Sequence, residues 1–231
     1  MHLTRIVLPV LDVDAAAGYY RTTLGLPVRT ETGAATVTIG RTRLDLHAAD
    51  ELPGPHHLAM TIPRHTFVSA RAWLEERAQL LSRDGEDEFE GPAGWNSRSL
   101  YFDGPEGAVL ELIERQDLAP GRSSSSFSAQ ELECVSEVGI AVPDVEQAAA
   151  LLQQSAGIET YEGSASGSFA AVGDIHGLLI LVRPGRAWLP TSDRYAAAVP
   201  TTVEATGPHS GACTLGAGTS VRVTGSSADH P

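Results

Sequence analysis

Residues 6–28 read IVLPVLDVDAAAGYYRTTLGLPV: an apolar run, an aspartate, a helix-forming stretch, and a glycine before a second apolar run. Residues 138–160 repeat this order as VGIAVPDVEQAAALLQQSAGIET. The aspartates of the two units, Asp12 and Asp144, are 132 positions apart, and the two glycines keep the same spacing, so the units align without a gap. Such a repeat indicates the architecture before single residues are considered.

A third copy begins at residues 57–63 (HLAMTIP), where Arg64 replaces the aspartate, and continues into a predicted helix at residues 65–81. Each aspartate is placed to cap its helix and each glycine to end it in a left-handed conformation. Two further strand-like segments joined by a turn then follow in each copy: residues 36–40 and 43–47, 99–102 and 108–113, and 168–173 and 177–182. The chain therefore predicts an α+β fold of tandem βαβββ modules.

Composition shifts divide the chain into four parts. Residues 1–116 contain two of the modules, and residues 130–205 contain the third. Residues 117–129, with a Pro-Gly pair and a serine run, are expected to form a polar linker. Residues 206–231 are rich in Gly, Ser and Thr and are expected to form a flexible tail, although residues 220–224 have the pattern of one strand.

The charge balance excludes several classes of partner. The chain of 231 residues has a formal net charge of −13, and its densest charge cluster, residues 84–90, is acidic, so nucleic acid and anionic membrane surfaces are not expected partners. No apolar run approaches the ~20 residues that span a bilayer. The two cysteines, Cys134 and Cys213, fit neither a disulfide scaffold nor a cysteine zinc site, and we expect a cytoplasmic protein.

The stretch from Tyr20 to Leu26 after Asp12, and the DGPEG sequence that leads into an L-E-L strand at residues 103–112, complete the repeated pattern. Three βαβββ copies with these motifs resemble the vicinal oxygen chelate superfamily, which includes glyoxalase I, bleomycin- and fosfomycin-resistance proteins and extradiol dioxygenases. The resemblance covers residues 3–203. It implies that two paired modules form a curved mixed-sheet cup with a divalent metal on its inner wall.

By this resemblance, residues 1–50 and 55–115 would form the cup. The third module would then need a partner of its own. Either a second chain supplies it, which would make a homodimer, or residues 200–224 form a partial fourth unit.

The family's metal ligands come from the first and last strands of the paired modules. In this sequence the matching positions are Arg5, Asp45, His57 and Glu111. The last three can bind Fe, Mn, Zn or Ni and leave positions open for substrate. His47 is an alternative to Asp45, and His2 or His56 would become alternatives if a strand end shifted register.

Arg5 departs from the family pattern, because a guanidinium has no lone pair for a metal. It could instead pair with Asp45 or Glu111 in a metal-free cup, or hold a substrate carboxylate or enolate beside the catalytic Glu111. In the third module, Glu137 occupies the first-strand position but Leu181 aligns with Glu111, so no ligand pair is expected there.

Trp95, Asn96 and Tyr101 lie on or before a strand that faces the expected cup, where aromatic walls suit a flat organic ligand; core packing explains them equally well. Two functions follow. The first is a glyoxalase- or extradiol-dioxygenase-like enzyme that acts on a small oxygenated compound with a divalent metal. The second is metal-free sequestration of a small molecule, as in bleomycin resistance. Phosphate-loop, nucleophile-elbow and dinucleotide motifs are absent from the sequence.

Overall fold

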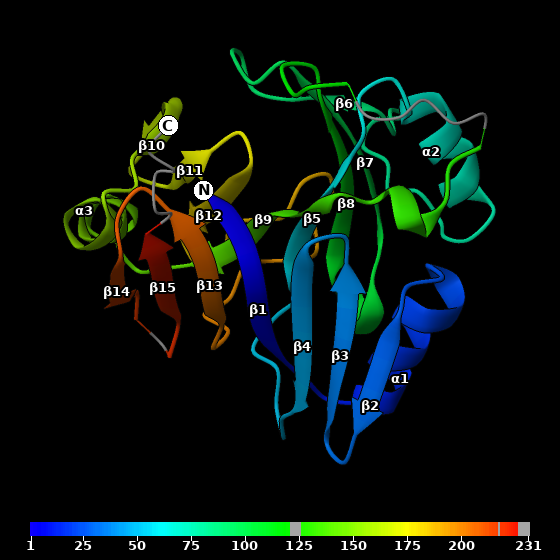
Figure 1. Cartoon of the computed structure of the whole chain (residues 1–231), viewed down its shortest axis with the longest axis horizontal. Coiled ribbons are helices and arrows are strands. Elements are labelled where there is room, and N and C mark those ends of the chain that lie inside the picture. The colour runs from blue at the N-terminus through cyan, green and yellow to red at the C-terminus, as the bar shows by residue number, and fades with distance from the viewer. Residues whose placement is uncertain (121–125, 217, 226–231) are drawn as a thin grey trace, which may run out of the picture.

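The computed structural model describes residues 1–120, 126–216 and 218–225, and its strands lie in two curved sheets (Figure 1). The first sheet, sheet A, has the order β14 (Gly211–Thr214), β15 (Ser220–Gly225), β13 (Thr202–Gly207), β1 (His2–Val10), β4 (Thr42–Ala48), β3 (Ala34–Ile39) and β2 (Val28–Glu31). The second, sheet B, has the order β10 (Thr160–Ser166), β11 (Phe169–Asp174), β12 (Gly177–Val182), β9 (Cys134–Ala141), β5 (His57–Ile62), β8 (Val109–Arg115), β7 (Ser97–Asp103) and β6 (Phe89–Glu90). The predicted α+β fold of βαβββ modules is confirmed.

The modules pair differently from the expectation. The second and third modules share sheet B through antiparallel β5 and β9, whereas the first module pairs β1 with β13 of a partial fourth unit. Residues 1–116 therefore do not form one cup. The first strand of a module is hydrogen-bonded along one edge to the last strand of the same module. Its other edge can pair with the first strand of any module whose register fits. Alternating hydrophobicity identifies the faces of a strand but not its partner.

The predicted flexible tail is largely structured. Residues 206–225 contain the end of β13 and the strands β14 and β15, and Val221 and Val223 of β15 are buried. Alternating valines among small polar residues supply one buried face, which suffices for a strand beside β13. The tail residues 217 and 226–231, and residues 121–125 of the predicted linker, lie outside the described residues.

The helices begin where the sequence predicts. Asp12 caps α1 (Val13–Gly18), which continues as one π-helical turn at Tyr19–Thr23, and Asp144 caps α3 (Val145–Ala156). Gly157 ends α3 in the left-handed conformation with φ 65°. Among the described helices, none is long and apolar enough to cross a membrane. The remaining short helices are 3-10 turns at Pro105–Gly107 and Ala129–Glu131.

The second-module helix, α2 (Phe67–Glu75), is shorter than the 65–81 that the sequence suggests. After Glu76 the chain turns and runs beside β7, where the Leu81 amide donates to the Tyr101 carbonyl at 2.8 Å. This exchange of helical for sheet hydrogen bonds brings the following loop to the edge of the sheet B cup.

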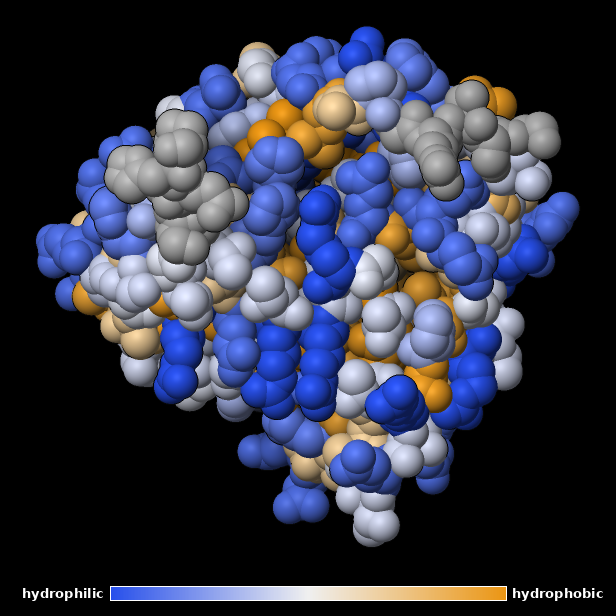
Figure 2. Space-filling view, in the orientation of Figure 1, coloured by the Kyte–Doolittle hydropathy of each residue, from blue (hydrophilic) through white to orange (hydrophobic). Residues whose placement is uncertain are grey.

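The two faces of sheet B have different roles. Leu58, Met60 and Leu110 point toward an apolar core that sheet B shares with sheet A and the helices. Their neighbours on the same strands point to the opposite face, which forms a cup lined by a separate apolar cluster. The outward face of sheet A is instead hydrophilic, as the blue side chains over its central strands show (Figure 2).

Candidate functional site

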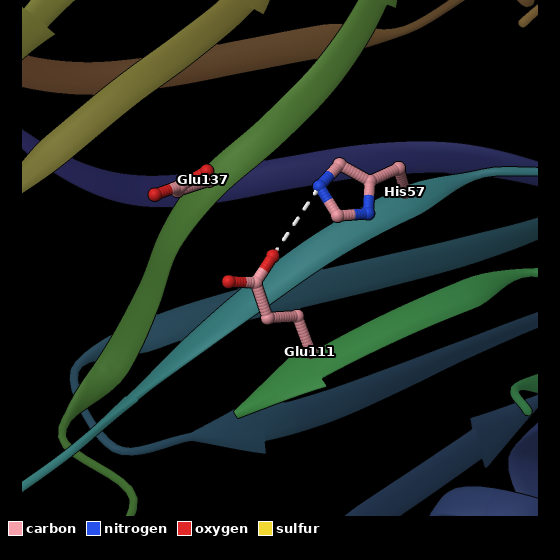
Figure 3. Close-up of side chains that lie close together, drawn as sticks. All are labelled: His57, Glu111 and Glu137. Carbon is pink, nitrogen blue, oxygen red and sulfur yellow. Dashed lines mark ion pairs between the residues drawn. The ribbon is translucent and has the colours of Figure 1, made fainter. Parts of the chain in front are cut away.

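Three ionisable side chains meet on the cup face of sheet B. His57, Glu111 and Glu137 each offer a ligand atom, and these atoms all lie within 4.8 Å of one another. The side chains converge from three adjacent strands, β5, β8 and β9 (Figure 3). All three are buried, with 6%, 2% and 4% of their surfaces exposed. Buried ionisable groups without full pairing are costly, so such a cluster indicates a site.

Strand register explains the convergence. Ala59 on the central strand pairs with Glu111 on one side and with Glu137 on the other. His57 precedes Ala59 by two residues and therefore points to the same face. The short side chain of Ala59 leaves the space between the two carboxylates open.

His57 is held in a tautomer that suits metal binding. Its Nδ1 lies 3.1 Å from the Val109 carbonyl oxygen, to which an N–H donates, and its Nε2 lies 3.6 Å from Glu111 Oε2. Burial lowers the pKa of His57 to about 4, so the imidazole is neutral at pH 7. The Nε2 lone pair therefore faces the cluster, as in histidines whose other nitrogen is bonded to a backbone carbonyl.

The two glutamates share one electrostatic environment. Burial, followed by repulsion from Glu137, raises the pKa of Glu111, while Ser99, Arg115 and Tyr101 oppose the shift. Burial also raises the pKa of Glu137, although the Arg115 guanidinium donates a hydrogen bond to its Oε1 and acts in the other direction. Without a cation, both carboxylates cannot easily be charged together. The pair therefore favours a bound cation or a proton.

The other expected ligands lie on sheet A. Asp45 accepts hydrogen bonds from Arg5 Nε at 2.6 Å, Arg43 Nε at 2.7 Å and Thr36 Oγ1 at 2.7 Å. Burial alone would raise the pKa of Asp45, but these bonds lower it below its ordinary value. Arg5 also pairs with Glu204 at 3.0 Å. Asp45 is therefore committed to arginines, and Arg5 does not approach Glu111.

The alternative histidines also lie outside the cluster. His47 is exposed on β4 of sheet A. His56 Nε2 is 2.8 Å from the Pro9 carbonyl oxygen, and the His2 ring lies 4.9 Å from the His176 ring. Glu137 takes the place that the sequence interpretation gave to Asp45. Its first-strand position was visible in the repeat, but its partnership with His57 depends on which modules pair.

The fourth position of the site is apolar. On β8, Glu111 lies two residues beyond the partner of His57. On β12, Leu178 pairs with Glu137, and the corresponding residue two positions on is Ile180. Ile180 lines the cup, whereas Leu181, which the sequence alignment placed there, points into the shared core. The cluster thus offers three ligands and leaves one side open.

An open cavity of about 810 Å³ lies over the three ligands. Trp95, Tyr101, Phe169 and Trp188 contribute aromatic walls. The Trp188 ring stacks on His57 at a centroid distance of 5.0 Å and 26° between planes. Asn96 does not line the cavity; its Nδ2 donates to Asp117 Oδ1 at 2.7 Å. Trp188 lies in the connection between β12 and β13 and was not among the wall residues that the sequence predicted.

Fold and site together define a class: paired βαβββ modules with a buried histidine and carboxylates at the base of a cup. Residues 2–112 match the family model "Glyoxalase/Bleomycin resistance protein/Dioxygenase superfamily". Sequence similarity to this superfamily therefore covers residues 2–112, just under half of the chain, and the solved structures described next share the fold.

Solved structures show the same fold at low sequence identity. A putative dioxygenase from Bacillus subtilis superposes with a TM-score of 0.60 at 15% identity, covering 97% of this chain and 85% of the other. Glyoxalase I from Zea mays superposes with a TM-score of 0.53 at 17% identity, covering 88% and 74%. No curated protein sequence matches the chain significantly.

Proposed function

We propose that this protein is a metal-dependent enzyme, glyoxalase- or dioxygenase-like, that acts on a small oxygenated organic compound in the cup of sheet B. His57, Glu111 and Glu137 would hold one divalent cation. The observation that carries the proposal is the convergence of their ligand atoms within 4.8 Å at the base of a large cavity. Structural ion pairs alone do not explain a cavity above three buried ionisable groups.

The residues present fit a divalent cation. The donor set is one neutral imidazole nitrogen and two carboxylates, which suits Fe, Mn, Zn or Ni. Without a cation the two glutamates repel each other and have raised pKa values. A bound cation would reduce this repulsion, as protonation does. The Val109 carbonyl and the Arg115 guanidinium orient two of the three ligands from behind.

A bound divalent cation would supply Lewis-acid stabilisation of negative charge on a substrate oxygen. The chain's own residues set the geometry around it. Trp188 and Tyr101 flank the imidazole of His57, at ring distances of 5.0 and 6.4 Å. Ile180 leaves the fourth side free of a protein ligand, so a substrate oxygen has room there.

Metal analysis of His57→Ala against the wild type tests the centre. We expect the wild type to bind about one divalent cation per chain and the variant to bind none, with affinity lower by a factor of roughly 100 or more. His47→Ala is the matched control, because His47 is exposed on sheet A. Equal metal content in wild type and His57→Ala would contradict the assignment.

Metal-free sequestration is the second candidate, and the aromatic cavity favours it independently of the ligands. It requires that a small molecule stabilise the protein after complete chelation and that no product form with or without added Fe, Mn, Zn or Ni. Turnover that appears on metal addition and disappears in His57→Ala would support a metal-dependent enzyme and contradict metal-free sequestration.

A further inference from the structure

Two exposed arginines line the cavity, in contrast to the buried ionisable residues at its base. Arg83 and Arg186 are exposed, whereas the other ionisable side chains of the lining, His57, Glu111 and Glu137, are buried. Neither arginine has an acidic partner within the part of the chain that the structure describes. In a chain of net charge −13, the accessible charges of this cavity are therefore positive.

Both arginines stand on fixed backbone from separate parts of the chain. Arg83 and Glu86 exchange backbone hydrogen bonds of 2.8 and 3.0 Å, which close a tight turn in the loop before β7. The Arg186 carbonyl accepts from the Ala196 amide at 2.8 Å, and its guanidinium carbon lies 5.2 Å from the Phe169 ring centroid. The backbone fixes where each side chain starts, and the planar guanidinium loses less freedom per hydrogen bond to a carboxylate than an ammonium group would.

Apolar side chains supply much of the remaining lining. Trp95, Tyr101, Ile180 and Trp188 belong to one hydrophobic cluster and line the cavity. A ligand that fills the cavity therefore contacts exposed guanidinium groups, apolar side chains, and the buried Glu111 and Glu137. The two glutamates disfavour an anion at the base when no cation is bound.

We propose that the cavity selects a carboxylate with an apolar or aromatic body, and that Arg83 and Arg186 bind the carboxylate at the exposed end. The neutral, oxygen-bearing end then faces His57, Glu111 and Glu137. Only the placement of the ligand's neutral end at these three residues rests on the proposed function. Recognition of the carboxylate by the arginines does not require a metal. Paired guanidinium–carboxylate hydrogen bonds supply the selectivity.

Binding of three matched probes to chelated protein tests the proposal. The probes are 3-phenylpropionate, 3-phenylpropanol and 3-phenylpropylamine, which share a body and differ in charge. We expect the carboxylate to bind roughly tenfold more tightly than the alcohol, and the amine more weakly than both. Calorimetry and the fluorescence of Trp95 and Trp188, which line the cavity, report binding.

Arg83→Gln and Arg186→Gln should each reduce the carboxylate preference, and the double variant should abolish it while leaving alcohol binding unchanged. Arg222→Gln, an exposed arginine of β15 on sheet A, is the matched control and should keep the preference. An unchanged preference in the double variant, or no saturable carboxylate binding below about 10 mM, would overturn the proposal. Because the protein is chelated, failure of the metal site leaves this readout intact.

Discussion

Single residues at the base of the cup owe their protonation states to burial. His57 is neutral because its pKa falls to about 4, and the glutamates hold protons more readily than in water. Arg115 is fully buried and contacts Glu137 with a positive charge. A divalent cation would therefore compete with protons for this site, and its affinity should rise with pH.

The metal-free protein should lose stability as pH rises above 6.5. Burial raises the folded pKa of Glu111 to about 8, and repulsion from Glu137 adds to the shift, so in this range the folded state retains a proton that the unfolded state releases. His57 acts oppositely, because its folded pKa of about 4 lies below its ordinary 6.5, and its contribution levels off as pH rises past 6.5. Thermal unfolding from pH 6.5 to 8.5 should show the loss, and saturating divalent metal should reduce it.

Glu111→Gln isolates this effect, because the amide cannot release a proton. The variant should show a smaller loss of stability than the wild type over the same pH range. A wild-type slope equal to that of the variant would show that the glutamates are not protonated in the metal-free fold.

Ile180 occupies the position of a fourth ligand, so Ile180→His should tighten metal binding. We expect affinity to rise roughly tenfold, because an added imidazole would complete a four-ligand set at the base of the cup. Ile180→Val is the control for the change in packing. Competition titration with a chelating dye measures both; unchanged or weaker binding in Ile180→His would place Ile180 outside the coordination sphere.

At the scale of elements, the connection at residues 183–196 closes one side of the cup by bringing Trp188 against His57. It requires Gly139 on β9. A Cβ at this position would lie 2.5 Å from Trp188 Cη2 and 3.0 Å from His57 Cβ. The ring and the glycine are thus parts of one packing arrangement.

Gly139→Ala should cost about 1–3 kcal/mol of unfolding free energy, because the added methyl overlaps the indole. In a Trp188→Ala background the same substitution should cost much less, since its main obstacle is gone. Denaturant unfolding of the four proteins measures the coupling. Additive costs would show that Gly139 and Trp188 do not constrain each other.

The sequence alone predicts these elements well, and two of the three clustered residues. Repetition and alternation locate the strands of His57 and Glu111 and the capped helices at Asp12 and Asp144. The same patterns cannot predict that Glu137 joins His57, because strand pairing between modules is a long-range choice between similar edges. For the same reason the sequence placed Leu181, and not Ile180, at the fourth position: a shift of one residue in strand register exchanges the two faces of the sheet.

At the scale of the whole molecule, each sheet joins two modules, and corresponding positions have diverged. Arg5 corresponds to His57, and Asp45 to Glu111, by their registers on parallel strand pairs. In sheet A the carboxylate is neutralised by Arg5 and Arg43. In sheet B a histidine replaces the first arginine and a second glutamate approaches. Arginines of the chain itself therefore balance the carboxylate charge on sheet A. The carboxylates on sheet B are not fully balanced and still favour a further positive charge.

Asp45→Asn and Glu111→Gln should therefore have opposite consequences. Asp45→Asn removes a charge whose partners are already in place, so it should cost about 1–2 kcal/mol of unfolding free energy and leave one metal per chain. Glu111→Gln removes a charge that burial disfavours, so the metal-free protein should be as stable as wild type or more so at pH 8, while metal binding is lost. Metal analysis and denaturant unfolding of both variants measure the contrast. Loss of metal in Asp45→Asn would mean that sheet A contributes to the metal centre. Equal losses of unfolding free energy in both variants would mean that the two sheets do not differ in how their carboxylate charge is balanced.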